Sequence, residues 1–174
     1  MYITLSQFRV EGDGTAFDEW FLPLADKMGA LPGNILYRML HDPNPALREQ
    51  AALAWCTWES ATPSWPPTSG LSPRFTDHAF RMAFARIVTH YVSHDAWMED
   101  GVLLRNAAAL ADIPGIMVNG RYDLQAPIGW AYDLKQAWPT AQLVIVDNAG
   151  HDPSNAGITK ELILATNHFA NPAG

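Results

Sequence analysis

Two short apolar segments near the C-terminus, each followed by a polar residue of catalytic type, most strongly restrict what this chain can fold into. Residues 116–118 are all apolar and lead into a loop that ends on Asp123. Residues 143–146 are also all apolar and lead into a loop that ends on His151. Apolar residues recur at helical spacing after each loop, over residues 129–138 and 158–169. This order of strand, helix, strand and helix, with strands apolar on successive residues, predicts a βαβα unit of a parallel sheet.

Asp123 and His151 stand at matching ends of the two predicted strands. A right-handed crossover brings the carboxyl ends of parallel strands to one edge of a sheet, so the two side chains can meet there. The carboxylate would accept the Nδ1–H of the imidazole and leave Nε2 free to take a proton from a nucleophile. For either residue alone a structural role is the alternative, with Asp123 capping a turn and His151 an ordinary loop histidine. Their matched placement favours an acid–base pair.

The nucleophile that such a pair would serve is not visible in the sequence. A serine of this type usually lies on a Gly-x-Ser-x-Gly turn between a strand and a helix. No such turn occurs in the 174 residues. Ser154 follows His151 by three positions and is the only serine near it in sequence, but we do not expect it to act as a substitute. The sequence therefore predicts the acid and the base of a triad without the nucleophile.

The chain upstream of residue 112 has a different pattern, in which helices dominate. Asn44 followed by Pro45 predicts the start of one helix, because Asn caps helices well and proline suits the first helical position. Asp77 predicts the start of another. A further helix is expected over about residues 100–110. Residues 63–74 contain too many prolines for regular structure and are expected to form a loop.

We therefore predict three parts along the chain. Residues 1–14 are expected to form a short strand and turn. Residues 15–111 are expected to form a helical domain that begins with an irregular helix over 17–28, and residues 112–170 a segment of parallel sheet with its helices. Two parallel strands do not make a stable sheet alone. We expect the other strands to come from the N-terminal segment, from a second copy of the chain in a homodimer, or from a complementing fragment.

Charge, hydropathy and cysteine content exclude several classes of function. The formal net charge of −7 is unsuited to a nucleic-acid surface, which needs clustered Lys and Arg. No apolar run approaches about 20 residues, and the N-terminus lacks the pattern of a signal peptide, so no membrane association is expected. A single cysteine, Cys56, cannot form an internal disulfide and is expected to be a buried thiol. This is typical of a cytoplasmic protein.

Several motifs occur together in an order that is known from one family. They are Trp55 to Thr62 (WCTWESAT), Ala85-Arg86-Ile87, Leu103 to Asn106 (LLRN), Gly120-Arg121-Tyr122-Asp123, Ala137-Trp138-Pro139 and Ala149-Gly150-His151. In these motifs the chain resembles the proline iminopeptidases (prolyl aminopeptidases), which are α/β-hydrolases with a helical cap. The resemblance runs from roughly Tyr37 to Phe169. It implies a partial α/β-hydrolase, in which a helical cap precedes the final βαβα unit of the core.

The resemblance also implies roles for three residues. Asp123 and His151 would be the acid and the base of a Ser-Asp-His triad, and Glu59 would bind the free α-amino group of a peptide substrate with N-terminal proline. The position of Glu59 beside Trp58, on a partly apolar helix face, agrees with this, because a carboxylate is costly to desolvate unless a cation pairs with it. The alternative is an ordinary salt bridge or a solvated helix end. The family usually has a second glutamate where this chain has Val88, which weakens the expected selection for a free N-terminus.

A rival constellation comprises His90 and His94, four positions apart on one predicted helix, with Asp95 and Glu99 nearby. This spacing can bind zinc. No glutamate follows His90, as the metalloprotease motif would require, and paired surface histidines are common. We therefore expect no metal and no cofactor. The predicted function is that of the C-terminal portion of a proline-iminopeptidase-like serine aminopeptidase, inactive without its serine-bearing half. The alternative is a non-catalytic binding or assembly module.

Overall fold

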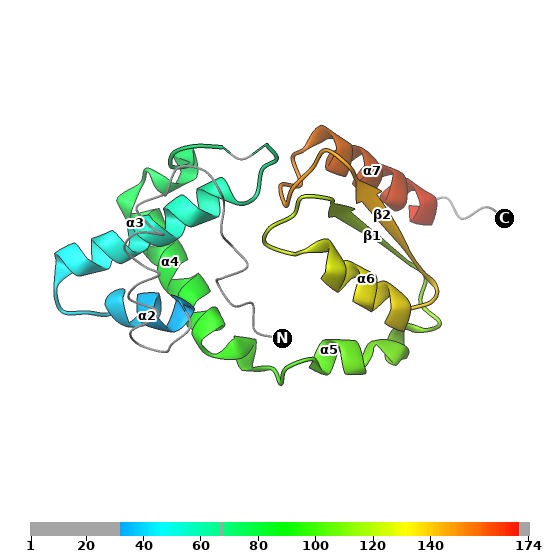
Figure 1. Cartoon of the computed structure of the whole chain (residues 1–174), viewed down its shortest axis with the longest axis horizontal. Coiled ribbons are helices and arrows are strands. Elements are labelled where there is room, and N and C mark those ends of the chain that lie inside the picture. The colour runs from blue at the N-terminus through cyan, green and yellow to red at the C-terminus, as the bar shows by residue number, and fades with distance from the viewer. Residues whose placement is uncertain (1–31, 67, 171–174) are drawn as a thin grey trace. The chain divides into compact units, whose positions relative to one another are not determined.

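A computed structural model describes residues 32–66 and 68–170, which fall into two compact units (Figure 1). The first unit holds residues 32–60 and 69–100, and the second holds 61–66, 68 and 101–170. The strand expected over residues 1–14 and the irregular helix expected over 17–28 lie outside the described residues. None of the described helices is both long enough and apolar enough to cross a membrane.

The first unit is helical. Its elements are α2 (Pro32–Met39), α3 (Pro45–Ala61), the 3-10 turn η2 (Pro73–Phe75), α4 (His78–Ser93) and the 3-10 turn η3 (Asp95–Trp97). The side chain of Asn44 accepts a hydrogen bond of 3.0 Å from the backbone N–H of Ala46, and Asp77 accepts one of 2.7 Å from Phe80. Both predicted helix starts are thus confirmed, because these side chains satisfy N–H groups that have no partner within the helix.

The core of this unit lies between α2, α3 and α4. The buried apolar residues are Ile35, Leu36, Leu40, Ala51, Ala52, Trp55, Cys56, Phe75 and Ala85. Helix α4 buries only some of its large apolar residues. Phe84 packs against the core, whereas Ile87 and Tyr91 are more than half exposed. Arg81 and Thr89 are buried in their place. Thr89 satisfies its hydroxyl by donating to the carbonyl of Ala85 at 2.7 Å.

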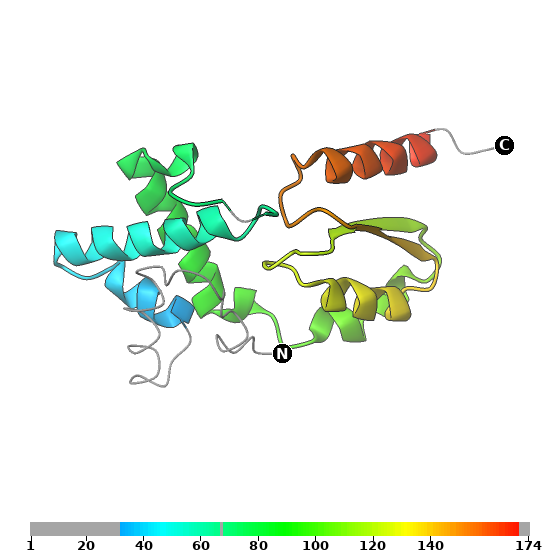
Figure 2. The ribbon, with the colours of Figure 1, turned by 45° about the horizontal axis from the view of Figure 1, so that its top comes forward.

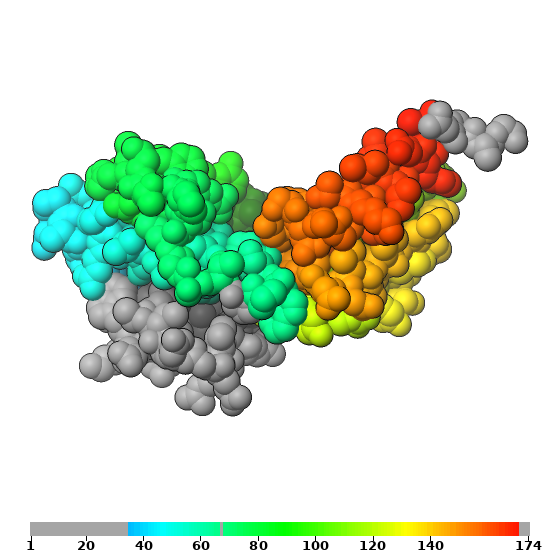
Figure 3. All heavy atoms as spheres, turned by 90° about the horizontal axis from the view of Figure 1, so that it is seen from above, coloured from blue at the N-terminus to red at the C-terminus, as the bar shows by residue number. Residues whose placement is uncertain are grey.

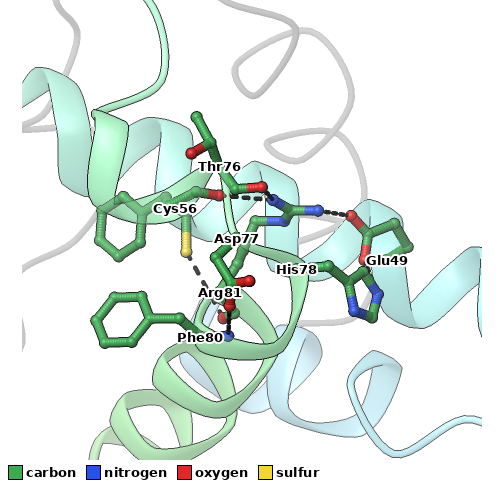
Figure 4. A network of polar contacts seen from close by, with 8 residues as sticks. Glu49, Cys56, Thr76, Asp77, His78, Phe80 and Arg81 are labelled. Carbon is green, nitrogen blue, oxygen red and sulfur yellow. Dashed lines mark hydrogen bonds and ion pairs between the residues drawn. The ribbon is translucent and has the colours of Figure 1, made fainter.

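Arg81 joins α4 to α3 through a partly buried polar network (Figure 4). Its guanidinium donates to the backbone carbonyl of Phe75 at 2.6 Å and forms an ion pair with Glu49 on α3. His78 contacts the other carboxylate oxygen of Glu49 at 2.8 Å. These partners explain how a charged residue is tolerated on the buried side of a helix.

The second unit contains the predicted βαβα segment. Strands β1 (Gly115–Gly120) and β2 (Ala141–Val146) pair in parallel, with Gly115 opposite Ala141 and Gly120 opposite Val146. Helices α6 (Ile128–Ala137) and α7 (Ala156–Ala170) pack on opposite faces of this sheet (Figures 1 and 2). The predicted partial α/β-hydrolase fold, mostly helical with a small parallel sheet, is thus what the described residues form.

The helix expected over residues 100–110 is divided into two short ones, α5 (Val102–Arg105) and the 3-10 helix η4 (Ala107–Leu110). The break falls at Asn106, whose side chain donates to the carbonyl of Val102 at 2.9 Å. The backbone N–H of Asn106 donates to the same carbonyl at 3.1 Å, so this residue closes the last turn of α5 with both groups. Sequence periodicity does not show such an end, and the prediction of one helix over these residues was wrong in this respect.

Candidate functional site

The loops that follow β1 and β2 are joined by backbone hydrogen bonds at residues that precede Asp123 in the first loop and His151 in the second. The N–H of Arg121 donates to the carbonyl of Val146 at 2.9 Å, and the N–H of Tyr122 donates to the carbonyl of Ala149 at 3.0 Å. These bonds extend the parallel pairing beyond the strands. They hold the first loop against the second just before Asp123.

Asp123 and His151 form the hydrogen bond that the sequence predicts. The Nδ1 atom of His151 lies 2.9 Å from Oδ2 of Asp123. The Asp123 side chain is 6% exposed, whereas that of His151 is 44% exposed. A carboxylate accepts, so Nδ1 carries the proton and Nε2 is left as the basic nitrogen. A half-exposed imidazole with this tautomer can take a proton from a group that approaches from outside.

The second oxygen of Asp123 is held by the backbone. Its Oδ1 accepts hydrogen bonds from the N–H groups of Gln125 at 2.9 Å and Ala126 at 2.7 Å. Asp123 therefore caps a turn with one oxygen and orients His151 with the other, so the two roles that the sequence left open coexist. Backbone donors of this kind fix the plane of the carboxylate.

Two glycines allow the loops to approach each other closely. A Cβ atom on Gly120 would lie 2.5 Å from the carbonyl oxygen of Ala149, and one on Gly150 would meet the carbonyl oxygen of Pro63. Real Cβ atoms do not come this close to backbone atoms. Glycine at these two positions is thus a steric requirement of the site.

The loop that follows α3 also reaches the site, which the sequence did not predict. Within the second unit, residues 61–66 (blue-green in Figure 3) lie against the segment that leads into α7 (orange). The backbone N–H of Asp152 donates to the carbonyl of Pro63 at 2.9 Å. The proline content of residues 63–74 predicted only an irregular loop, and no local sequence pattern indicates which residues this loop contacts.

Glu59 lies on α3 in the first unit, whereas Asp123 and His151 lie in the second. Its side chain is partly buried, three residues from the buried Cys56. Burial raises the pKa of the Cys56 thiol to about 12, opposed by the positive charge of Arg81 and assisted by the negative charge of Glu59. The carboxylate of Glu59 is therefore close enough to the core of the first unit to act on this thiol. Its role toward a substrate remains a prediction.

The paired histidines of the rival constellation have local partners. The Nδ1 atom of His94 lies 2.7 Å from the carbonyl oxygen of His90, and the two rings are 4.5 Å apart. Among residues 32–66 and 68–170, no three His, Cys, Asp or Glu side chains are grouped so that they could hold a metal ion.

Comparison with known proteins places these features in context. Residues 87–162 match the family model of the TAP-like proteins. The chain is 44% identical over 153 residues to a probable proline iminopeptidase of Streptomyces coelicolor, covering 86% of this chain and 46% of that protein. It is 40% identical over 147 residues to a proline iminopeptidase of Xanthomonas citri (84% and 45%) and 40% identical over 134 residues to a probable one of Leptolyngbya boryana (76% and 42%). The chain thus spans about half the length of the relatives that it matches. The predicted resemblance is confirmed by these matches.

Proposed function

We propose that this chain supplies the acid, the base and the amino-group ligand of a serine aminopeptidase that releases N-terminal proline from peptides. The observation that carries the proposal is the hydrogen bond between Asp123 and His151, with Nε2 of the histidine left for a nucleophile. The similarity to proline iminopeptidases supports the choice of substrate. The serine would come from a Gly-x-Ser-x-Gly turn on polypeptide outside this sequence.

Each residue has a defined step in this reaction. The serine Oγ attacks the carbonyl carbon of the N-terminal proline while its proton passes to Nε2 of His151, and Asp123 stabilises the resulting imidazolium. His151 then gives the proton to the leaving amine, and the C–N bond breaks. Water, deprotonated by the same Nε2, hydrolyses the ester and releases proline.

Glu59 would select substrates with a free N-terminus. A protonated proline nitrogen is a cation, and a partly buried carboxylate gains most from such a partner. Residues 15–111, which contain Glu59, would be the helical cap domain, and residues 112–170 would belong to the catalytic core. Because Val88 stands where the family usually has a second glutamate, we expect weaker selection than in a two-carboxylate site.

The first test is whether the chain is inactive alone and active when completed. The chain by itself should neither hydrolyse a proline arylamide nor react with a fluorophosphonate at any serine, because its sequence contains no Gly-x-Ser-x-Gly turn to carry the covalent step. Mixed or co-expressed with the portion of the Streptomyces coelicolor relative that lies outside the matched region, it should turn over the arylamide. Turnover should vanish with His151→Gln. Labelling of Ser154 in the isolated chain, with turnover, would contradict the proposal.

The test of Glu59 uses the same completed enzyme. Glu59→Gln should raise KM for a proline arylamide far more than for an N-acetylated one, since only the former carries the cation. Glu161→Gln, at a carboxylate on α7, provides the matched control and should leave KM unchanged for both substrates. Equal effects of Glu59→Gln on both substrates would remove Glu59 from the proposal.

A second candidate function is a binding or assembly module, and the sheet gives the reason to consider it. Within the described residues β1 and β2 pair only with each other, and Ile145 on β2 is 39% exposed. Unpaired strand edges with apolar side chains invite association. We therefore expect a homodimer or a complex with a complementing fragment. Light scattering that shows a stable monomer at tens of micromolar, roughly the range where exposed edges associate, would contradict this.

We also propose the cytoplasm as the compartment, because one buried thiol and no disulfide partner suit a reducing environment. Fractionation of cells that express the tagged chain, with detection in the membrane or the medium, would contradict it.

A further inference from the structure

We propose that residues 62–65 are positioning residues that hold the Asp123 loop and the His151 loop in register for catalysis. We call this segment the clamp. The inference rests on the proposed function of the Asp123–His151 pair, and concerns residues whose role no sequence pattern indicates. It is carried by contacts that reach residues close to Asp123 and His151, from a segment distant in sequence.

On the Asp123 side the clamp makes two contacts. The side-chain amide of Gln125 donates to Oγ1 of Thr62 at 2.7 Å, and Thr62 is only 4% exposed. The ring of Trp65 stacks on that of Tyr122, with centroids 4.2 Å apart and an interplanar angle of 22°. Gln125 also gives its backbone N–H to Asp123, and Tyr122 directly precedes that residue. The clamp therefore touches residues on both sides of the carboxylate.

On the His151 side the clamp acts through its backbone. The carbonyl of Pro63 accepts a hydrogen bond of 2.9 Å from the N–H of Asp152. The same carbonyl packs against Gly150 so closely that a Cβ atom there would collide with it. Gly150 and Asp152 are the immediate neighbours of His151 in sequence. The clamp thus fixes the backbone on both sides of the base.

This arrangement has a mechanical consequence for the pair. The hydrogen bond between Asp123 and His151 needs both loops at a fixed separation. Backbone hydrogen bonds already join the two loops up to Tyr122 and Ala149. The clamp adds contacts to both loops beyond that point, at Gln125 and at the two neighbours of His151. Hydrogen bonds in active sites depend on such supporting contacts for sub-ångström placement.

The test measures the Asp123–His151 hydrogen bond directly, without substrate. In NMR spectra of the full chain labelled with ¹⁵N, the Nδ1 proton of His151 should resonate at low field and exchange slowly with water. Asp123→Asn and His151→Gln identify the signal by removing it. Thr62→Val and Trp65→Ala should each speed its exchange by at least about fivefold, the effect of losing one hydrogen bond or ring contact. Trp65→Phe, which keeps the stacking, should restore the slow exchange.

Matched substitutions in the same unit separate positioning from general loosening. Thr166→Val removes a hydroxyl that bonds to Leu162 on α7, and Trp130→Ala removes a ring on α6 that is as exposed as Trp65, at 37% against 40%. Both should leave the exchange rate unchanged. If Trp65→Ala prevents folding, the test uses Thr62→Val and Gln125→Ala, which remove the two sides of one hydrogen bond. Both should speed the exchange of the His151 proton, and no change in either would overturn the inference.

The outcomes distinguish this inference from the proposed function. Unchanged exchange in folded Thr62→Val and Trp65→Ala, or equal acceleration in the controls, would overturn the clamp and leave the acid–base pair intact. Absence of the signal in the unmodified chain would also overturn it. A normal signal with no turnover in the completed enzyme would overturn the proposed peptidase and leave the clamp standing. In an active completed enzyme, the clamp substitutions should lower kcat with little change in KM.

Discussion

The Nδ1 atom of His151 lies 2.9 Å from Oδ2 of Asp123, while the other oxygen of the same carboxylate receives two backbone N–H groups. One buried side chain thus joins a turn of the first loop to the imidazole of the second. The imidazole is held in one tautomer, in which Nε2 is the basic nitrogen.

Replacing Asp123 by Asn should abolish most activity of the completed enzyme. The amide would present an N–H or a neutral oxygen to His151, so the tautomer and the stabilisation of the imidazolium are lost, which costs about 10⁴-fold in kcat in a triad. The measurement is the kcat for a proline arylamide. Asp147→Asn, at the exposed partner of Arg121, is the control and should leave kcat unchanged. A loss below about tenfold for Asp123→Asn would remove Asp123 from the triad.

Replacing Gly150 by Ala should destabilise the chain by about 1–3 kcal/mol, because the added methyl group overpacks against the carbonyl of Pro63. Gly129→Ala is the matched control. A Cβ atom at Gly129 on α6 meets nothing within 4 Å, so this change should stabilise by about 0.4–1 kcal/mol by restricting the unfolded chain. Urea denaturation of the two variants measures both effects. Equal stability of the two would show that the close approach does not exist in solution.

Removing Glu49 should leave Arg81 with an uncompensated charge. The Arg81 side chain is 10% exposed and that of Glu49 is 33% exposed, so Glu49→Ala should cost about 1–3 kcal/mol, less than breaking a fully buried pair. Glu161→Ala removes a carboxylate of similar exposure (28%), whose pair with Lys160 is longer, at 3.7 Å, and whose partner is 72% exposed, so stability should change by less than about 0.5 kcal/mol. Thermal unfolding followed by circular dichroism compares them. A cost for Glu49→Ala no greater than that of the control would mean that the ion pair does not stabilise the fold.

Stability should fall with rising alkaline pH through Cys56. Burial raises the pKa of its thiol from 9.0 to about 12, so between these values the folded chain keeps a proton that the unfolded chain has lost. The free energy of unfolding then decreases with pH, by at most about 1.4 kcal/mol per pH unit from this group. Below pH 9 both states are protonated and the group contributes no slope.

The variant Cys56→Ala isolates this contribution from the other groups that titrate at high pH. The difference in unfolding free energy between the parent chain and the variant should shrink as pH rises from 9 to 12. A difference that stays constant over this range would contradict a buried, protonated thiol. Iodoacetamide should also fail to modify Cys56 at pH 8 until the chain is unfolded, because the residue is fully buried.

Local patterns explain why part of the fold could be predicted. The starts of α3 and α4 depend on Asn44 and Asp77, whose side chains cap the turns that follow them directly. The pairing of Asp123 with His151 depends on strand periodicity and on the handedness of crossovers, which hold for parallel sheets in general. These signals lie within short windows of sequence, so reasoning from residues alone can reach them.

The features that were missed depend on partners far away in the chain. Arg81 is buried because Glu49, 32 residues earlier, pairs with it, and no local pattern shows this. Thr62 contacts Gln125 across 63 residues, and the intervening sequence gives no sign of the contact. Hydrophobic spacing indicates which residues of a helix prefer burial. Which face of the helix is buried in the fold depends also on such long-range partners.

The clamp at residues 62–65 determines where this chain can be joined to a relative in a chimaera. The sheet segment and its two loops are continuous in sequence, so an exchange of the helical region between relatives would place the junction just before residue 101. That cut would discard the piece directly after α3 that is bonded to both loops. The smallest portable unit is therefore discontinuous, and chimaeras should carry residues 61–68 from the same parent as the sheet.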